Sequence, residues 1–500
     1  MTVRITVVLL TFFITPYVLN GLGKEMYGLN SLMLQTVGYL GLADFGLGKA
    51  IHIAYYKALS TKNNNKINIV FNSANNIYLF ISAMILILGL TLCFFLEYFF
   101  QINPELVLLS KYVFVIYAIK SAVSYVFGSY QSLIISDQKQ YKLGFINLFF
   151  RPLYVISNGL VIYFGGLLLE LVICSLIISL IFEFIKYIVI RRNYPFLKKT
   201  NKTRHKALLK TSFYVLIDKI VKLSYKRLDF ILIGIYLSLS DVASFAIYMT
   251  FSLILERFYI SAITPIQPGI GNLIHKKEIK KIKDLFKDMI TTVFFFQILI
   301  CSALIFFLQS FVINWVGEDM LINGNFIYFF VMVIFIKPLL IVNNSFIDAK
   351  DLFKKKMYGS IIEISLNVLV SIFLVKSFGV LGLIVGTLTG YLLMQIWYVP
   401  YIFNRSFKIS SLYYFIEVLK YFLFFFINIL VLSFFFEIIV DYTSVQSSWL
   451  SFIYYFSIFI TLSLIINVIV FFLFDKNFKF ILNRFKQIFF QIKKIFHGEV

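Results

Sequence analysis

The class of fold is decided by residues 71–96, which read FNSANNIYLFISAMILILGLTLCFFL and contain no Asp, Glu, Lys or Arg. About 20 apolar residues in a helix cross the hydrocarbon core of a bilayer, so this run is long enough to span it. Comparable runs recur from one end of the chain to the other. The pattern predicts a helical protein that crosses the membrane many times.

The composition agrees with this prediction. The 500 residues are 60% hydrophobic and only 14% charged, with a mean hydropathy of +0.88. Soluble domains average about 45–50% apolar and about 25% charged residues, which excludes an ordinary soluble protein. Spans joined by short loops use up the chain, so no room is left for a separate catalytic or nucleotide-binding domain.

Polar clusters divide the apolar sequence into fourteen predicted helices, so we expect about 14 transmembrane helices and no strands. Their ranges are 3–20, 27–53, 71–96, 112–135, 144–163, 167–190, 213–237, 242–264, 289–314, 326–347, 358–375, 379–402, 415–440 and 451–474.

The basic residues predict how these helices are oriented. With the N-terminus inside, the predicted cytoplasmic segments hold 31 Lys and Arg, whereas the outer loops hold only Lys24, Lys111 and Lys376. Cytoplasmic loops of membrane proteins carry such an excess of positive charge. We therefore expect both termini to be cytoplasmic. Much of the net charge of +22 is then topological, which argues against nucleic acid as a partner.

Loop features repeat about 211 to 216 residues apart, and each half of the repeat holds an even number of spans. Repeats of this kind are parallel and place a substrate site between the halves near mid-membrane. We expect two parallel six-helix bundles around a central cavity, with two further helices. The predicted divisions are a bundle at 1–190, a basic cytoplasmic linker at 191–212, a second bundle at 213–402, two additional helices at 403–474 and a basic tail at 475–500.

The seventh predicted span is unusual because its first half is charged. Each charge that faces lipid near the bilayer centre costs about 2.5–3.5 kcal/mol, so we expect the charged face to line a cavity. The alternative is an ion-paired stripe at a contact between helices. In that stripe Asp218 pairs with Lys222, and Lys226 pairs with Asp229, along the same helix. Arg227 projects off the charged arc. At about 100° per residue, five charged positions fall within an arc of about 100°: Asp218, Lys219, Lys222, Lys226 and Asp229.

Other charges lie within predicted spans. We expect Lys120, Arg151 and Lys337 to add to an anion-binding region. Three other cations lie close enough to helix ends to reach the membrane surface: Arg4, Lys186 and Lys420. A mid-membrane excess of cations indicates an anionic substrate such as a phosphate or pyrophosphate, which Lys binds as a point charge and Arg binds with a fork of donors.

Four acidic residues are candidates for carrying a coupling ion, H⁺ or Na⁺: Asp44, Glu256, Asp218 and Asp229. For the first two, the alternative is a structural ion pair, Asp44 with Lys49 and Glu256 with Arg257. The three cysteines lie in apolar runs and the four histidines have no ligand spacing, so we expect neither a metal nor an organic cofactor.

Several motifs together resemble the polysaccharide-export flippases of the Wzx type, the O-antigen translocases. The resemblance covers most of residues 1–402, and the two last predicted helices go beyond the twelve common in that family. The motifs are Leu22-Gly-Lys-Glu-Met-Tyr-Gly28-Leu29, Leu42-Ala-Asp44-Phe-Gly46-Leu-Gly48-Lys-Ala50, Leu228-Asp229-Phe-Ile-Leu-Ile-Gly234 with Val242-Ala-Ser-Phe245, and Gly379-Val-Leu-Gly382-Leu-Ile-Val-Gly386.

The resemblance implies the fold of the multidrug/oligosaccharidyl-lipid/polysaccharide exporter superfamily, as seen in MATE transporters. It implies that a polyprenyl-pyrophosphate-linked oligosaccharide, such as an O-antigen or capsule repeat unit, is carried from the inner to the outer leaflet of the bacterial cytoplasmic membrane. The mechanism would be alternating access driven by a proton or sodium gradient. Membrane lipids and other polysaccharide assembly proteins are the implied partners, and no enzyme activity is implied.

Three alternatives stay open at this point. A multidrug or cation antiporter of the same fold would favour an acidic cavity for cationic drugs. A flippase for a peptidoglycan or teichoic precursor shares every feature cited above. A membrane oligosaccharide polymerase is an enzyme that needs catalytic residues on the outer face, where the loops of this chain are all short, the longest lying near 97–111.

The predicted topology can be tested by placing cysteines in the loops of intact cells and adding a membrane-impermeant thiol reagent. Cysteines at inner-loop positions should resist labelling and those at outer-loop positions should react. Labelling at Lys202 in sealed cells would contradict the predicted topology. The inner positions are Asn64, Lys202 and Lys354, and the outer positions are Asn103, Asn323 and Ser447.

Overall fold

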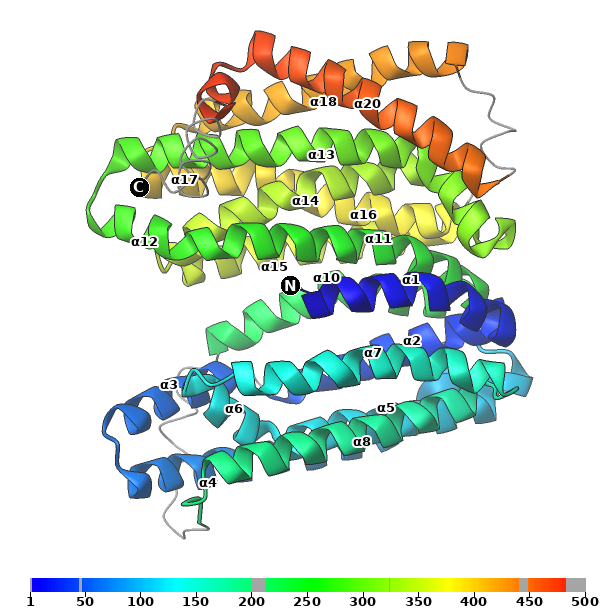
Figure 1. Cartoon of the computed structure of the whole chain (residues 1–500), viewed down its shortest axis with the longest axis vertical. Helices are drawn as coiled ribbons and strands as arrows, with labels where there is room; N and C mark the ends of the chain where they lie inside the picture. The colour runs from blue at the N-terminus through cyan, green and yellow to red at the C-terminus, as the bar shows by residue number, and fades with distance from the viewer. Residues whose placement is uncertain (1, 45–46, 199–212, 323, 440–447, 483–500) are drawn as a thin grey trace, which may run out of the picture. The chain divides into compact units, whose positions relative to one another are not determined.

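A computed structural model of the chain describes residues 2–44, 47–198, 213–322, 324–439 and 448–482. In these ranges the regular structure is entirely helical (Figure 1), as the sequence predicts. The chain forms two compact units. The N-terminal unit comprises the described residues of Met1–Tyr248 with Val375–Val380, and the C-terminal unit those of Met249–Leu374 and Leu381–Val500.

The N-terminal unit contains nine α-helices in its described residues, together with the start of α11 and a 3₁₀ turn, η1, at Gly41–Asp44. Its long helices α5, α7 and α8 run side by side in Figure 1. The helices are α1 (Thr2–Leu22), α2 (Lys24–Leu40), α3 (Leu47–Ser60), α4 (Asn64–Phe99), α5 (Pro104–Val126), α6 (Gly128–Ser136), α7 (Tyr141–Tyr163), α8 (Leu168–Asn193) and α10 (Phe213–Tyr236).

The C-terminal unit begins within α11, and its last two helices, α18 and α20, pack together on α13. Short helical turns lie at Thr264–Ile266 (η2) and Glu318–Met320 (η3), and a π-helical turn lies at Met394–Tyr398 (η4). The helices are α11 (Leu239–Ile263), α12 (Gln267–His275), α13 (Ile279–Val316), α14 (Phe326–Ala349), α15 (Phe353–Phe378), α16 (Val380–Leu393), α17 (Val399–Phe407), α18 (Ser411–Ile439) and α20 (Trp449–Phe474).

In their described residues all fourteen predicted spans are largely helical, but their number as membrane spans is not confirmed. Among the described residues, 11 helices are long and apolar enough to cross a membrane, or up to 12 if the bent pair α1–α2 is one span. The axes of α1 and α2 are bent by 116°, where Gly23 has a φ of 78°. The charged helix α10 is not among the 11.

Three predicted helices are interrupted in the structure. The predicted span 27–53 is divided by η1 into α2 and α3, and the predicted span 112–135 is divided at Phe127 into α5 and α6. The predicted span 379–402 contains the π-helical turn η4, which lies directly before Pro400 in α17. Proline lacks an amide donor and disturbs the regular bonding of the preceding turn.

The compact units also group the helices differently from the predicted bundles, because α10 lies with the N-terminal helices in the structure. The predicted boundaries at 190 and 213 therefore stay a prediction.

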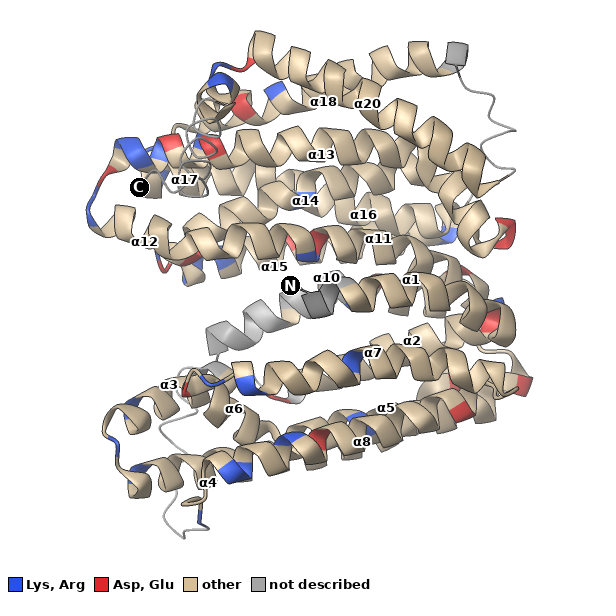
Figure 2. Cartoon of the chain, in the orientation of Figure 1, with Lys and Arg blue, Asp and Glu red and all other residues tan. Residues whose placement is uncertain are grey.

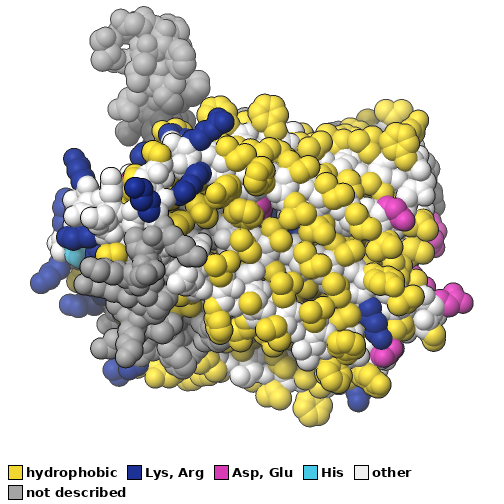
Figure 3. All heavy atoms as spheres, turned by 90° about the horizontal axis from the view of Figure 1, so that it is seen from below, with side chains coloured by type: hydrophobic (Ala, Val, Ile, Leu, Met, Phe, Trp, Pro, Cys, Tyr) yellow, Lys and Arg dark blue, Asp and Glu magenta, His cyan; other side chains and the backbone are white. Residues whose placement is uncertain are grey.

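Charge and hydrophobicity are segregated within each unit. In the N-terminal unit Lys and Arg gather at the end that holds the α3–α4 turn, and in the C-terminal unit at the end that holds the α12–α13 turn; the opposite ends carry mainly Asp and Glu (Figure 2). The face shown in Figure 3 is a broad field of hydrophobic side chains between a basic and an acidic end. Phe80, Phe94 and Phe149 are more than 60% exposed, as expected for side chains that meet lipid.

Close helix packing in the C-terminal unit depends on small residues. On α16, Gly382, Gly386 and Gly390 face α15, and a Cβ at Gly382 would lie 2.5 Å from the carbonyl carbon of Leu374. Asn367 of α15 donates to the hydroxyl of Thr387 across the same interface, at 3.0 Å. Small residues allow backbones to approach in membrane helices, and polar side chains then bond across the contact.

Candidate functional site

The charged stretch of the seventh predicted span is helical, since it lies within α10. The side chains of Asp218, Lys219, Lys222 and Lys226 lie outside the described residues, so their orientation toward a cavity stays a prediction. Asp229, the last member of the arc, is buried, with 8% of its surface exposed.

Arg227, also on α10, contacts the backbone of α2. Its Nη1 donates to the carbonyl oxygens of Leu34 and Gln35, at 3.2 and 3.3 Å. The guanidinium lies directly over Gly38, where a Cβ would fall 1.5 Å from Nη1. The guanidinium therefore donates to neutral backbone acceptors. It occupies a space on α2 that a side chain larger than that of glycine would fill.

Lys120 lies on α5 and is surrounded by hydroxyl groups and aromatic rings. Its Nζ is 3.2 Å from Ser175 Oγ and 3.4 Å from Tyr154 Oη, and 4.4 Å from the centre of the Tyr154 ring. Among the side chains that the structure describes, none forms an ion pair with Lys120 within 4.0 Å. The ring face and hydroxyls stabilise the ammonium group in place of a carboxylate.

Arg151, on α7, is exposed. It lies near enough to Lys186 of α8 for the two cations to interact electrostatically. The sequence placed Arg151 with Lys120 in an anion-binding region, and the structure records no direct contact between these two residues within its described part.

Lys337 and Glu256 are brought together in the C-terminal unit. Lys337 Nζ, on α14, is 3.1 Å from Glu256 Oε2 and 2.9 Å from Ser252 Oγ, both on α11. Both charged side chains are largely buried, at 16% and 13% exposed. Glu256 thus has an ion-pair partner on another helix, while the neighbouring Arg257, its expected alternative partner, is exposed.

Asp44 is half-buried in η1, at the break between α2 and α3. Its carboxylate interacts with the hydroxyl of Tyr125 on α5 and lies near Tyr78 on α4. Tyr125 Oη is also 3.3 Å from the carbonyl oxygen of Gly41. The side chain of Lys49, the expected alternative partner, lies outside the described residues.

One buried polar group was missed by sequence reasoning. Lys186 does not reach the membrane surface as expected; its Nζ pairs with Glu183 Oε1 at 2.5 Å, and both side chains are under 10% exposed. The Nε2 of Gln131, on α6, donates to the other carboxylate oxygen of Glu183 at 2.7 Å. The spacing of three residues between Glu183 and Lys186 was the available signal for this pair.

Lys420 is a second correction, because it is held between two carboxylates. Its Nζ is 2.5 Å from Glu417 Oε2 and 3.2 Å from Asp475 Oδ2. Asp475, at the end of α20, also accepts a hydrogen bond from Tyr421 at 2.9 Å. These bonds join the end of α20 to α18.

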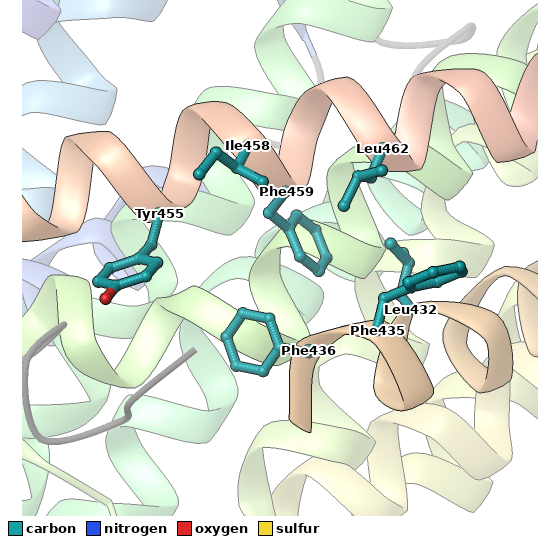
Figure 4. A pocket seen from close by; sticks show the side chains of 7 residues that line it. All are labelled: Leu432, Phe435, Phe436, Tyr455, Ile458, Phe459 and Leu462. Carbon is teal, nitrogen blue, oxygen red and sulfur yellow. The ribbon is translucent and has the colours of Figure 1, made fainter. Parts of the chain in front are cut away.

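An apolar pocket lies between α18 and α20 (Figure 4). Its side chains come from both helices, and Phe436 and Phe459 also belong to the aromatic cluster that packs on Phe307 of α13. The lining residues are Leu432, Phe435, Phe436, Tyr455, Ile458, Phe459 and Leu462. Such a lining suits a hydrocarbon chain and offers almost nothing to a polar ligand.

The sequence and the fold are both similar to known proteins. The family model described as polysaccharide biosynthesis protein matches residues 1–274. No curated protein matches the sequence at a significant level.

Among solved structures, the lipid II flippase MurJ in an inward closed conformation aligns with a TM-score of 0.73 and 16% identity, over 95% of this chain and 98% of that chain. An inward-facing multidrug resistance transporter of the MATE family and MOP superfamily aligns with a TM-score of 0.61 and 14% identity, over 77% and 91% of the two chains. An outward-facing structure of such a transporter aligns with a TM-score of 0.53 and 13% identity, over 82% and 93%. The fold is therefore that of MurJ and the MATE transporters, which confirms the expected fold class.

The buried Glu183–Lys186 pair leads to a prediction about stability. Glu183→Gln leaves the Lys186 cation buried without its carboxylate, which costs about 3–5 kcal/mol, so the amount of folded protein in membranes should fall severalfold. The double variant Glu183→Gln with Lys186→Met removes both charges and should recover most of that loss. Abundance and melting temperature in detergent measure the effect. If the single and double variants lose the same amount of folded protein, the loss does not come from leaving the Lys186 charge unpaired.

Proposed function

The chain belongs to the polysaccharide biosynthesis protein family, and we propose that it is a flippase for a polyprenyl-pyrophosphate-linked oligosaccharide. It would move the lipid-linked repeat unit of an O-antigen, capsule or exopolysaccharide from the inner to the outer leaflet of the bacterial cytoplasmic membrane. Family membership and the MurJ-like fold support this class of activity. The observation that carries the proposal is the group of cations in the first half of α10.

The cations on α10 suit the pyrophosphate group. Lys219, Lys222 and Lys226 follow one another at three- and four-residue intervals, so a helix places them on one side within about 11 Å. Ammonium groups bind phosphate as point charges, and the guanidinium of Arg227 adds a fork of donors. Lys120, Arg151 and Lys337 are the secondary candidates. Of these, Lys120 is the better placed, because its described contacts are hydroxyls and rings rather than a carboxylate.

The other end of the proposed substrate is its polyprenyl tail. A polyprenyl tail is a long hydrocarbon that must stay in lipid or in a greasy groove while the headgroup crosses the membrane. The pocket between α18 and α20 is apolar but too small to enclose such a tail, so the tail would stay in the lipid beside the helices.

Translocation of this kind makes and breaks no covalent bond in the cargo, so the proposed protein is a transporter and not an enzyme. Transport would proceed by alternating access, with the substrate site open in turn to each side of the membrane. Membrane lipids and other polysaccharide assembly proteins are the proposed partners, and H⁺ or Na⁺ is the proposed coupling ion.

A multidrug transporter is the second candidate, because two of the similar folds are multidrug resistance transporters. Cationic drugs require unpaired carboxylates. In the described part of the chain, the carboxylates of Glu183, Glu256 and Glu417 lie against lysines, which makes them less available to a cationic drug.

The proposed headgroup site predicts that Lys222→Gln combined with Lys226→Gln lowers export of the lipid-linked oligosaccharide at least tenfold while protein abundance stays near normal. The measurement is the leaflet distribution of the lipid-linked repeat unit in cells, with a cytoplasmic accumulation expected in the variant and in cells that lack the protein. The matched control is Lys280→Gln with Lys283→Gln, which removes the same charge from exposed positions at the start of α13.

Two results would contradict this proposal. Normal export in the double variant would exclude α10 as the anion site and leave Lys120, Arg151 and Lys337 as candidates. Accumulation of single repeat units on the outer leaflet in cells that lack the protein would indicate a polymerase.

We also propose that Asp44 or Glu256 carries the coupling proton, with Asp218 and Asp229 as further candidates. Asp44→Asn and Glu256→Gln should each be measured in sealed vesicles under imposed pH gradients. The variant at the coupling site should lose the dependence of transport on the gradient, since an amide cannot exchange a proton near neutral pH. If both variants transport normally at every gradient, neither residue is the coupling site.

A further inference from the structure

The second half of α10 packs against α2 where a glycine leaves room for a leucine side chain. A Cβ at Gly234 of α10 would lie 2.7 Å from Cδ2 of Leu32, on α2. The amide of Gln101 donates to the carbonyl oxygen of Gly234 at 2.8 Å. The Gly234–Leu32 contact holds the second half of α10 against α2 by shape and without charge.

Among the described residues of this interface, the charged contact is made by Arg227 of α10. The carbonyl oxygens of Leu34 and Gln35 that accept from its Nη1 lie inside α2, where the regular helical pattern already gives each of them an amide donor four residues later. The guanidinium therefore shares acceptors that are in use. Among the described residues, its hydrogen bonds are these two, although a guanidinium has five N–H donors.

A pyrophosphate group is a much stronger acceptor than a shared helical carbonyl. Hydrogen bonds from a guanidinium to phosphate are charge-assisted, often paired, and about twice as strong as bonds between neutral groups. Lys219, Lys222 and Lys226 precede Arg227 by at most eight residues on the same helix, which is about 12 Å along its axis. The long side chain of Arg227 can therefore rotate to reach a headgroup that is bound along this stretch.

We propose that Arg227 is a latch that the anionic headgroup releases. Without ligand, the guanidinium sits over Gly38 and fastens α10 to α2. When a pyrophosphate binds beside α10, the guanidinium transfers from the carbonyl oxygens of Leu34 and Gln35 to phosphate oxygens, and α10 separates from α2. The nature of the releasing ligand rests on the proposed function, whereas the latch contact itself does not.

The latch accounts for the glycine at position 38. Any side chain there would occupy the place of the guanidinium, since the Cβ would lie 2.0 Å from Cζ and 2.6 Å from Nε as well as 1.5 Å from Nη1. Gly38→Ala should therefore expel Arg227 from its seat and imitate the ligand. At Gly144 of α7, a Cβ meets nothing within 4 Å, so Gly144→Ala is the matched control.

Thiol cross-linking between Leu32→Cys and Gly234→Cys measures the contact of the two helices. The native Cys93, Cys174 and Cys301 are first replaced by Ala, and the full-length protein is purified in detergent. The probes are polyprenyl pyrophosphate, polyprenyl monophosphate and uncharged polyprenol. A separate binding assay with radiolabelled polyprenyl pyrophosphate shows whether each variant holds the ligand.

In the protein with Arg227, we expect polyprenyl pyrophosphate to slow cross-linking at least threefold, the monophosphate to act more weakly and polyprenol to have no effect. Arg227→Gln and Gly38→Ala should cross-link slowly without ligand and show no further response, while Gly144→Ala should behave as the parent protein. Arg227→Lys keeps the positive charge but has no forked set of donors, so its cross-linking rate should be intermediate. This variant replaces Arg227→Gln in the test if Arg227→Gln folds poorly.

The outcomes separate the latch from the proposed function. If the parent protein binds polyprenyl pyrophosphate but its cross-linking rate does not change, the latch is wrong and the headgroup site stands. If Arg227→Gln and Arg227→Lys cross-link as fast as the parent without ligand, Arg227 does not fasten α10 and the latch is again wrong. If the parent protein binds no polyprenyl pyrophosphate, both the headgroup site and the ligand-released latch are wrong.

Discussion

A charge inside a membrane-spanning helix must find a partner, because the surrounding hydrocarbon offers none. This constraint explains why the buried lysines of the described spans lie against carboxylates or other polar groups. Lys186 lies against Glu183 within α8, and Lys337 of α14 lies against Glu256 of α11. Each of these contacts neutralises a cation and at the same time fixes how helix faces are turned.

The cations without a described carboxylate partner are satisfied in weaker ways, and this difference points to function. Lys120 rests on a tyrosine ring and two hydroxyls, and Arg227 rests on helical carbonyls over Gly38. A cation that is held by weak neutral acceptors can exchange them for an anion at a low cost in free energy. A buried ion pair, in contrast, loses several kcal/mol when one member is removed, about 3–5 kcal/mol in measured cases. The exchangeable cations are therefore the better candidates for contact with an anionic headgroup.

Small residues decide where helices can approach closely enough for such contacts. Gly386 brings α16 to the backbone of α15, and Gly38 opens α2 to the guanidinium of Arg227. Between α13, α18 and α20 the same role falls to polar and aromatic groups: Ser302 donates to Asn428 at 2.9 Å, and Phe307 packs on Phe436 and Phe459. The last two helices are thus part of the C-terminal core, and the apolar pocket lies between them.

The sequence by itself determined the class of fold, most of the helical stretches and the charged character of α10, because these depend on local hydropathy and helical period. It located Asp44, Glu256 and Lys337, but not what they contact. Only the tertiary structure paired Lys337 with Glu256, buried Lys186 beside Glu183 and placed Arg227 over Gly38. It also divided the predicted span 27–53 at η1 and placed α10 with the N-terminal helices. The physical reason is that partners such as Arg227 and Leu34 are almost two hundred residues apart in the chain, and no local pattern records which helix faces meet.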